Sequence, residues 1–386
     1  MPKSIIILHR SVGWDKDSRI RKLVQSFQEK SFDVAAFIWE RANVKREIKV
    51  GNNATIFCNK IPLVSQNKLR GAAVISALEI IQEFFQGIMF IFLRKPDIII
   101  IQNHRQFLHL FSACIYKLFR RNDVKVVWDL REIPNIFGNF RITRYLFSIL
   151  CLIPTYIWVM NKGRLQHMIN TYTLADKKFH IVPNFCELQY WDAAQDALPT
   201  LVEIFLDGAE YVYVQNPFIK ERYGYNSIAS VLLETDKKII CTGNVTGHLE
   251  NDLIKNFGEQ LISENVQFTG SLQEAQLKPL IDNCSYSIIL YDYTIVNNYY
   301  CDANRLYQCI SRCIPVIVGI NPGLSDYVKS YKLGLVTTDD GRDIEALRGT
   351  VVKLESMLGS GISPMFFKAR DAMAWERNQM IFDLLK

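Results

Sequence analysis

The sequence predicts two α/β domains, each built on a mostly parallel β-sheet, within a chain of 386 residues. Short apolar runs alternate with amphipathic helical patterns, as in parallel sheets that are covered by helices. The chain is too long for one ordinary core and suits two domains of about 150–200 residues. A polar, irregular stretch over residues 186–203 separates two alternating series. We therefore expect domains at 1–184 and 185–362, followed by a C-terminal helix at 363–386.

The first series begins with a continuous apolar strand at residues 5–9, as expected for a strand covered on both faces. Residues 18–30 then carry apolar side chains at helical spacing. Further strands are expected at 33–38, 97–101, 124–128, 158–161 and 180–182, with a helix at 109–119.

The second series repeats this alternation after residue 203. Its strands are expected at 211–214, 238–241, 266–268, 286–290 and 315–318. Helical patterns separate them at 227–233, 248–257, 271–282 and 304–311. Residues 364–385 carry the apolar stripe of a last helix.

The net charge of +6 suits an anionic ligand such as a nucleoside diphosphate, or an anionic membrane surface. The basic residues form no long run and no nucleic-acid-binding motif, so we expect no nucleic acid as partner. The apolar run after Met1 is too short for a secretory signal, which predicts a cytoplasmic protein.

Nine cysteines are scattered without CxxC pairs, as expected of reduced, mostly buried thiols. Cys301, Cys309 and Cys313 lie close together, but their spacing fits no zinc motif and no histidine is near. We therefore expect no metal site.

Two apolar stretches bear on membrane contact, at residues 84–93 and 145–160. Both are shorter than the roughly 20 residues that a spanning helix needs. The favoured interpretation is a buried helix followed by a buried strand. The alternative is an amphipathic face beside Lys and Arg that makes peripheral contact with a membrane.

The most informative stretch, residues 302–318, predicts a loop, a short helix and a buried strand. Asp302 or Asn304 is expected to cap the helix, whose N-terminus can bind phosphate. Arg305 lies in the first turn, where a cation is unfavourable for the helix alone, so either it meets an anionic ligand or it is a surface residue. Gln308 lies one turn after Asn304 on the same face and can hydrogen-bond the hydroxyls of a ribose or sugar.

A second group of candidates lies at strand ends in the first domain. Ligands of open α/β sheets bind beyond the carboxyl ends of the strands. His9 and Gly13 lie at the end of the first strand, and His104 follows the strand at 97–101. All three are expected on the acceptor side, although each histidine can equally be structural.

Residues 302–318 resemble the donor-site motif of family 4 (group 1) glycosyltransferases, which have the GT-B fold. The match runs through Asn304, Arg305 and Leu306 to Pro315. Six further stretches resemble family motifs in the same order: DSRI at 17–20, VWDLRE at 127–132, VPN at 182–184, NPGLSDYV at 321–328, LGLV at 333–336 and AMAWE at 372–376.

This resemblance implies two Rossmann-like domains with an interdomain cleft and a C-terminal helix that crosses back to the first domain. The first domain would bind the acceptor and the second the nucleotide sugar. The implied activity is transfer of a sugar from a nucleotide diphosphate sugar to a carbohydrate or lipid-linked glycan acceptor, in capsule, O-antigen or exopolysaccharide synthesis. It would be retaining and metal-independent, with no cofactor beyond the donor substrate.

The resemblance also implies roles for individual residues. Lys220 and Arg222 would supply cations to the diphosphate; the alternative is that they belong to a solvated, charged loop. Independently of the resemblance, Gly243 and Asn244 follow the strand at 238–241, where a bare backbone can meet the nucleotide. The catalytic candidates are Arg222, Arg131 and Glu132.

Four positions differ from the family pattern. Gln308 and Tyr300 stand where the family has glutamate, and Cys313 stands where it has glycine. Arg131 stands where the family has histidine. Arg131 cannot act as a base, but it can hold a phosphate or an acidic sugar.

Two other functions remain open from the sequence. A nucleotide-sugar 2-epimerase shares this architecture and needs acid and base groups, which are few here. An inactive GT-B homologue that serves as a scaffold or partner of an active transferase is favoured by Gln308 and Arg131.

Overall fold

The structure is a computed structural model of the chain. It describes residues 2–11, 14, 17–40, 46–60, 72–119, 123–134, 140–172, 174, 178–193, 197–215, 225–243, 249–358, 364–378 and 382.

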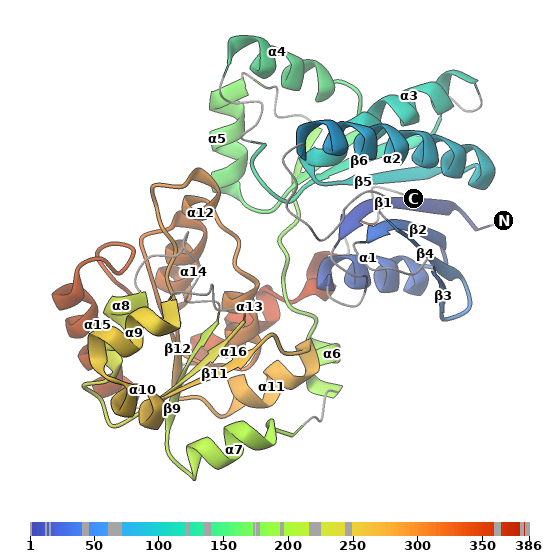
Figure 1. Ribbon diagram of the computed structural model, residues 1–386. Helices are drawn as coiled ribbons and strands as arrows, with labels where there is room; N and C mark the ends of the chain where they lie inside the picture. Colours follow the sequence, from blue (N-terminus) through green and yellow to red (C-terminus); the bar gives the residue numbers. More distant parts are fainter. Residues whose placement is uncertain are drawn as a thin grey trace. The chain divides into compact units, whose positions relative to one another are not determined.

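The chain divides into two compact units (Figure 1). Unit 1 comprises Met1–Pro183 and Asn378–Lys386, and unit 2 comprises Asn184–Arg377. The segment predicted as one C-terminal helix is therefore shared between them. Helix α16 (Pro364–Ala372) and most of the 3-10 helix η5 (Trp375–Asn378) belong to unit 2. In unit 1, Phe382 stacks edge-on against Phe27.

The described part of unit 1 contains an eight-stranded sheet with the order β3-β4-β2-β1-β5-β6-β7-β8. All neighbouring strands are parallel except β3, which pairs antiparallel with β4. This hairpin was not predicted from the sequence. The strands are β1 (Ser4–Ser11), β2 (Asp33–Glu40), β3 (Arg46–Val50), β4 (Ala54–Lys60), β5 (Ile98–Gln102), β6 (Lys125–Leu130), β7 (Tyr156–Val159) and β8 (Phe179–Ile181).

Helices cover both faces of this sheet, as Figure 1 shows with α1 on one side of the strands and α2 and α3 on the other. In α1, Asp17 caps the N-terminus and the predicted apolar stripe is buried. The α-helices of unit 1 are α1 (Ser18–Glu29), α2 (Ala72–Arg94), α3 (Leu108–Phe119), α4 (Arg141–Leu150) and α5 (Lys162–Tyr172). The 3-10 helix η2 (His104–Gln106) lies between β5 and α3.

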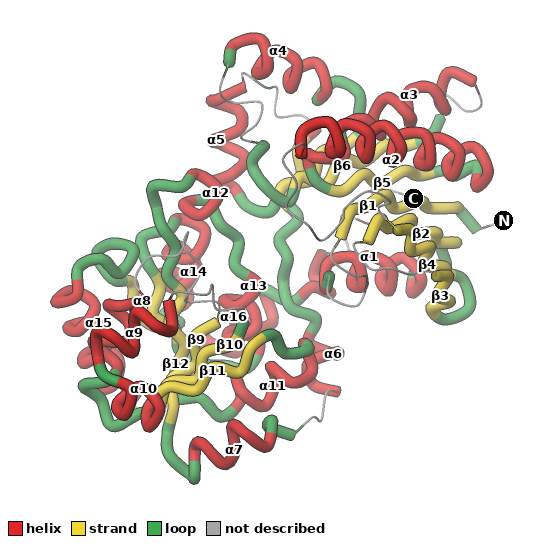
Figure 2. Tube along the Cα trace, in the orientation of Figure 1, coloured by secondary structure: helices red, strands yellow, loops and turns green. Residues whose placement is uncertain are grey.

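Unit 2 contains a six-stranded parallel sheet with the order β11-β10-β9-β12-β13-β14 in its described residues. Its strands are β9 (Tyr211–Gln215), β10 (Lys238–Thr242), β11 (Val266–Gly270), β12 (Tyr286–Ile289), β13 (Val316–Val318) and β14 (Gly334–Val336). The alternation of helix and strand predicted from the sequence is visible in both units in Figure 2.

Two apolar cores enclose the sheet of unit 2. One contains buried residues of α13, α14 and α16, and the other contains residues of α8 and α15. The helices of this unit are α6 (Leu188–Ala193), α7 (Thr200–Leu206), α8 (Tyr225–Leu232), α9 (Leu249–Phe257), α10 (Glu259–Asn265), α11 (Glu274–Asp282), α12 (Val296–Tyr299), α13 (Asn304–Ser311), α14 (Pro322–Tyr331), α15 (Ile344–Leu358) and α16.

The motif glycine Gly334 has a structural reason in this fold. Its φ is +144°, in the region that favours glycine, and it pairs with Val316 on β13. A Cβ at this position would collide with the Val316 backbone. Gly334 therefore allows β14 to join the sheet.

The helix before β7 differs from the favoured prediction for residues 145–160. Strand β7 is buried as predicted. In α4, however, only Phe147 and Leu150 are buried, while four other apolar residues are exposed. The interpretation of this segment as a buried helix is therefore wrong. Similarly, α2 exposes Phe85, Met89 and Leu93 from the apolar stretch at 84–93.

None of the described helices is long and apolar enough to cross a membrane. All nine cysteines are free, and all except the partly buried Cys114 are buried, as predicted. The described residues contain no cluster of three or more side chains suited to hold a metal ion.

Candidate functional site

In each sheet, the strands that follow the first one along the chain are added on one side of it, and later strands are added on its other side. In unit 1 the switch point between the two sides lies between β1 and β5, and in unit 2 it lies between β9 and β12. Ligands of open α/β sheets bind at the carboxyl ends of the strands beside such a point. The two switch points therefore define where to examine the candidate residues.

At the end of β1, three polar side chains form a compact cluster. The Nε2 atom of His9 lies 3.0 Å from Oδ2 of Asp17. Arg131, which follows β6, donates to both carboxylate oxygens of Asp17 at 2.6 and 3.1 Å. Asp17 also accepts from the backbone of Arg19 and Ile20 as the cap of α1. One carboxylate thus joins the ends of β1 and β6 to the start of α1.

Burial and charge act against each other in this cluster. Burial would raise the pKa of Asp17, but the Arg131 guanidinium and His9 hold it well below its usual range. Burial would lower the pKa of Arg131, yet Asp17 raises it. Burial also lowers the pKa of His9, despite its bond to Asp17. At neutral pH the cluster therefore holds a carboxylate, a guanidinium and an uncharged imidazole.

A fully buried ion pair lies behind this cluster. Arg19 donates from Nε and Nη2 to both oxygens of Asp129, each at 2.8 Å, and from Nη1 to the Val182 carbonyl at 3.2 Å. Gln102 donates to the same carboxylate at 3.2 Å. These bonds fasten α1, β5 and β6 together, and they give a structural role to the arginine of the DSRI motif.

The other acceptor candidates lie near this switch point or outside the described residues. His104 begins η2 after β5 and is buried, and burial lowers its pKa while nearby Glu132 partly opposes this. Glu132 itself is exposed beyond the end of β6. Gly13 is not among the described residues.

In unit 2, Arg305 occupies the first turn of α13 and is only 4% exposed. Its Nη2 atom lies 3.4 Å from the hydroxyl of Tyr291, and its guanidinium lies 5.8 Å from the centre of that ring. Its charge also reaches Tyr213 on β9, where burial raises the hydroxyl pKa and Arg305 partly opposes this. The guanidinium therefore lies at the β9–β12 switch point.

No carboxylate in the described part of the chain pairs with Arg305. Arg305 therefore differs from the equally buried Arg19, which has Asp129. A buried charge without a counter-ion costs several kcal/mol, so such a residue is typical of sites that bind an opposite charge. The expectation of a surface arginine is wrong, because the side chain is buried.

The first turn of α13 also lacks a side-chain cap. The N-cap residue is Ala303. The prediction that Asp302 or Asn304 caps this helix is therefore wrong. Asp302 instead accepts from the Tyr307 hydroxyl and the Asn184 backbone, and Asn304 accepts from the Asn184 amide at 2.5 Å.

Two other predicted donor-site residues lie on α13. Gln308, one turn after Arg305, is buried, and its Oε1 atom has no hydrogen-bond partner among the described residues. Such an acceptor usually has a partner, which a bound hydroxyl would supply. Leu306 points the other way and is fully buried in the apolar core.

The neighbouring strand ends complete the switch point. Thr242 ends β10, and its hydroxyl lies 3.1 Å from that of Tyr213. Gly243 follows with a φ of +102° and donates its N–H to the Gly270 carbonyl at 2.7 Å. Lys220, Arg222 and Asn244 lie outside the described residues.

Sequence reasoning missed the parts played by Asp17, Tyr213 and Thr242. Asp17 was noted only as part of a motif, although its position before a helix after β1 indicates a cap near the site. Tyr213 lies within the strand predicted at 211–214, and Thr242 directly follows the strand predicted at 238–241. The rule that placed His9 and His104 at strand ends also applies to Thr242.

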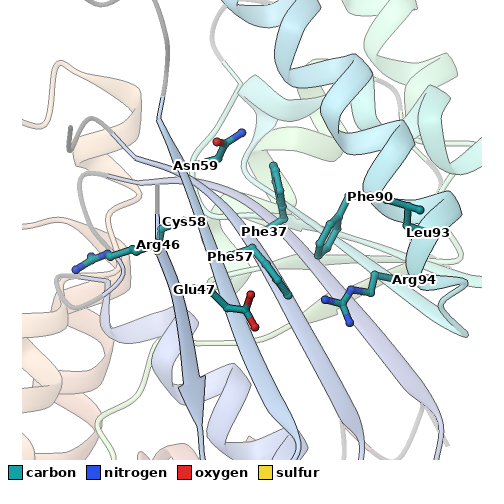
Figure 3. A pocket seen from close by; sticks show the side chains of 9 residues that line it. All are labelled: Phe37, Arg46, Glu47, Phe57, Cys58, Asn59, Phe90, Leu93 and Arg94. Atoms are coloured by element: carbon teal, nitrogen blue, oxygen red, sulfur yellow. The ribbon is translucent and has the colours of Figure 1, made fainter. Parts of the chain in front are cut away.

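A separate pocket of about 450 Å³ lies between α2 and strands β2, β3 and β4 (Figure 3). Phe37, Phe57 and Phe90 face it, and Arg94 lies over the Phe57 ring at 4.6 Å. The side chains that line it come from elements that carry none of the predicted site residues. We therefore assign it no part in the candidate site.

Comparison of the sequence with protein-family models and with curated proteins gives no match. Solved structures do match over the whole chain. Sucrose-phosphate synthase from Thermosynechococcus elongatus has a TM-score of 0.74 at 11% identity, over 99% of this chain and 98% of that chain. The chain has a GT-B fold.

Two further GT-B matches were solved with ligands. A trehalose-6-phosphate protein from E. coli, bound with UDP-2-fluoro glucose, has a TM-score of 0.72 at 11% identity, over 100% of this chain and 99% of that chain. Anabaena HepE, in complex with UDP and glucose, has a TM-score of 0.64 at 13% identity, over 99% of both chains. At these identities the likeness concerns the fold, and activity must be argued from the site.

Proposed function

We propose that this protein is a glycosyltransferase that transfers a sugar from a nucleoside diphosphate sugar to a carbohydrate acceptor. The observation that carries the proposal is the buried guanidinium of Arg305, which has no carboxylate partner among the described residues. It lies beside an uncapped helix start, at the switch point where such folds bind ligands. A diphosphate would supply the missing negative charge.

The proposed chemistry follows from the needs of the leaving group. As the bond to the sugar breaks, negative charge grows on the diphosphate, and Arg305 with the N–H groups of α13 would stabilise it. We propose that Lys220 and Arg222 add further cations. Gln308 would accept a hydrogen bond from a hydroxyl of the ribose or sugar. In this proposal the reaction retains the anomeric configuration and needs no metal ion.

On unit 1, we propose that the acceptor binds at the β1–β5 switch point. His9 lies there as a buried, uncharged imidazole bonded to Asp17, and Glu132 offers an exposed carboxylate. Arg131 is bound to Asp17, so its first role is to hold that carboxylate and shape the surface around it. We propose a lipid-linked or growing surface polysaccharide as acceptor, which would bring the enzyme into peripheral contact with a membrane.

The GT-B likeness supports the proposal, because two matched structures were solved with UDP or a UDP-sugar. The buried Arg305, which pairs with no carboxylate in the described part of the chain, favours an active donor site over an inactive scaffold. A 2-epimerase would act on the donor alone, whereas a transferase needs an acceptor. Dependence of the reaction on an acceptor therefore separates a transferase from an epimerase.

The test is an assay of nucleoside diphosphate release from UDP-glucose, UDP-N-acetylglucosamine and GDP-mannose, with and without membrane glycolipid extract as acceptor. We expect acceptor-dependent release from one donor. Arg305→Met should abolish most of it. Arg348→Met is the matched control, because this half-buried arginine forms surface ion pairs with Glu234 and Glu345, and its loss should leave the rate unchanged. Equal rates in both variants would overturn the site assignment.

A further inference from the structure

Helix α4 of unit 1 exposes more of its apolar side chains than it buries. Ile142, Tyr145, Leu146 and Ile149 are 41–70% exposed. At 3.6 residues per turn these four positions fall within an arc of about 100° on the helix. Phe140 and Leu152, which flank the helix, are also exposed. Together these six residues form what we call the α4 face.

Folding does not explain this face. Helix α4 is held to unit 1 by Phe147, which packs against Trp128 and Tyr172, and by the Ser148 hydroxyl, which donates to the Tyr172 carbonyl. The opposite side therefore has no part in the core. Monomeric soluble proteins rarely expose contiguous apolar surface of this kind without a binding partner.

The charges of α4 indicate the kind of partner. Its ten residues contain two arginines, Arg141 and Arg144, both exposed, and no acidic residue. An apolar arc bordered by Arg, with aromatic Phe140 and Tyr145 among its residues, is the composition of helices that lie in the interface of an anionic bilayer. The two arginines would be attracted to an anionic partner but not to a neutral or positively charged one.

Two other helices of unit 1 also expose apolar side chains. On α2, Phe85, Met89 and Leu93 recur every four residues and are exposed, and on the adjacent α3 Leu118 and Phe119 are exposed. Figure 1 places α2, α3 and α4 on the side of the unit 1 sheet away from α1. The helices that carry these exposed side chains therefore cover the same face of the sheet (Figure 1).

We propose that unit 1 docks onto an anionic lipid bilayer through the α4 face, with Arg141 and Arg144 at the headgroups. The inference rests on the proposed function, since a lipid-linked acceptor would lie in that bilayer. Its test nevertheless needs no active enzyme. Docking would hold the acceptor-binding end of unit 1 close to the membrane surface.

The experiment is co-sedimentation of the full-length protein with vesicles of phosphatidylcholine alone or with 30% phosphatidylglycerol. We expect binding to the anionic vesicles only, weakening as salt is raised. Replacing both arginines with serine should lower the partition about 30-fold, because each contributes roughly fivefold near an anionic surface. Ile142→Ser with Leu146→Ser and Ile149→Ser should abolish binding.

The matched control is Leu201→Ser with Ile204→Ser on α7 of unit 2. These residues are 73% and 70% exposed, so the same polarity change falls on another apolar surface. This variant should bind vesicles like the parent protein. Equal loss in both variants, or equal binding to neutral vesicles, would overturn the proposal.

Size-exclusion chromatography with light scattering tests the alternative that a second copy of the chain covers the α4 face. A dimer that the α4 variants convert to a monomer, without vesicle binding by the parent protein, would also overturn the proposal. UDP binding by the same samples reports separately on the donor site. Loss of vesicle binding with intact UDP binding leaves the proposed function standing.

Discussion

Two buried arginines of this chain offer a direct comparison. Arg19 makes a two-bonded ion pair with Asp129, whereas Arg305 contacts the hydroxyl and ring of Tyr291 and pairs with no carboxylate among the described residues. The same substitution by Met, which keeps the length and removes the charge, should therefore have opposite consequences. If the partner of Arg305 is an anionic ligand, removing its charge should hardly lower the free energy of unfolding of the ligand-free protein.

The magnitudes follow from what each substitution leaves behind. Arg19→Met leaves the Asp129 carboxylate fully buried, with Gln102 as its one side-chain donor among the described residues, which costs about 3–5 kcal/mol. For a unit of this size that lowers the melting temperature by about 6–20 °C. Arg305→Met leaves no charge unpaired, so we expect the free energy of unfolding to change by less than about 1 kcal/mol, with stabilisation as the favoured sign.

The assay must separate the two units, because a two-unit chain need not unfold in one step. Calorimetry of the ligand-free variants gives the melting temperatures. Hydrogen exchange read by mass spectrometry assigns any loss to peptides of β6 or of β12. A loss of 3 kcal/mol or more in Arg305→Met, localised to unit 2, would refute the reasoning, because it would show that Arg305 is a structural residue.

Three further predictions concern unit 1. Burial lowers the pKa of His109 to about 3. The neutral imidazole therefore contributes its full stability above the unfolded pKa of about 6.5, and this contribution is lost as pH falls towards 3. Between pH 7 and 5 the free energy of unfolding should fall by about 2 kcal/mol relative to His109→Leu, measured by urea unfolding at both pH values. Gly87→Ala should lower stability by about 1–3 kcal/mol, because a Cβ there would overlap the His109 ring, which is stacked on Trp39 and cannot move aside; an unchanged urea midpoint would contradict this. Asp17→Asn should cost about 2–3 kcal/mol, because Arg131 loses its carboxylate while the helix cap survives, and a thermal melt that matches the parent protein would count against the cluster.

The fold could be predicted from the sequence where the physical signal was strong. Several buried parallel strands carry a continuous apolar run, as β1 does at residues 5–8, and these strands were predicted in their correct order along the chain. The parallel strands β4 and β14 were not predicted. The β3–β4 hairpin escaped notice because β3 lies at the sheet edge. Its residues Arg46–Val50 are polar or half-exposed, and the stretch carries little periodic signal.

The exposure of α4 could not be predicted. Apolar spacing shows that residues share one face of a helix, but it does not show whether the protein's own core covers that face. Phe147 and Leu150 point inward while Ile142 and Ile149 point outward, and all four look alike in sequence. Only the packing of α4 on unit 1 separates them.

At the candidate site, sequence identified the right helix but not its environment. Arg305 and Gln308 were expected to share one helix, and they do. That Arg305 is buried without a carboxylate partner among the described residues depends on the surrounding fold. The cap by Asp302 failed for a related reason, since Tyr307 and the Asn184 backbone hold its carboxylate.

The central claim is that unit 2 binds a nucleoside diphosphate through Arg305. Isothermal titration of the full-length protein with UDP and GDP tests it most directly. We predict saturable binding of one nucleotide, weakened about 10- to 150-fold in Arg305→Met, since a charged hydrogen bond contributes about 1.5–3 kcal/mol. Arg348→Met should bind like the parent protein. Nucleotide binding that is equally tight in Arg305→Met, or no binding of either nucleotide by the parent protein, would contradict the account.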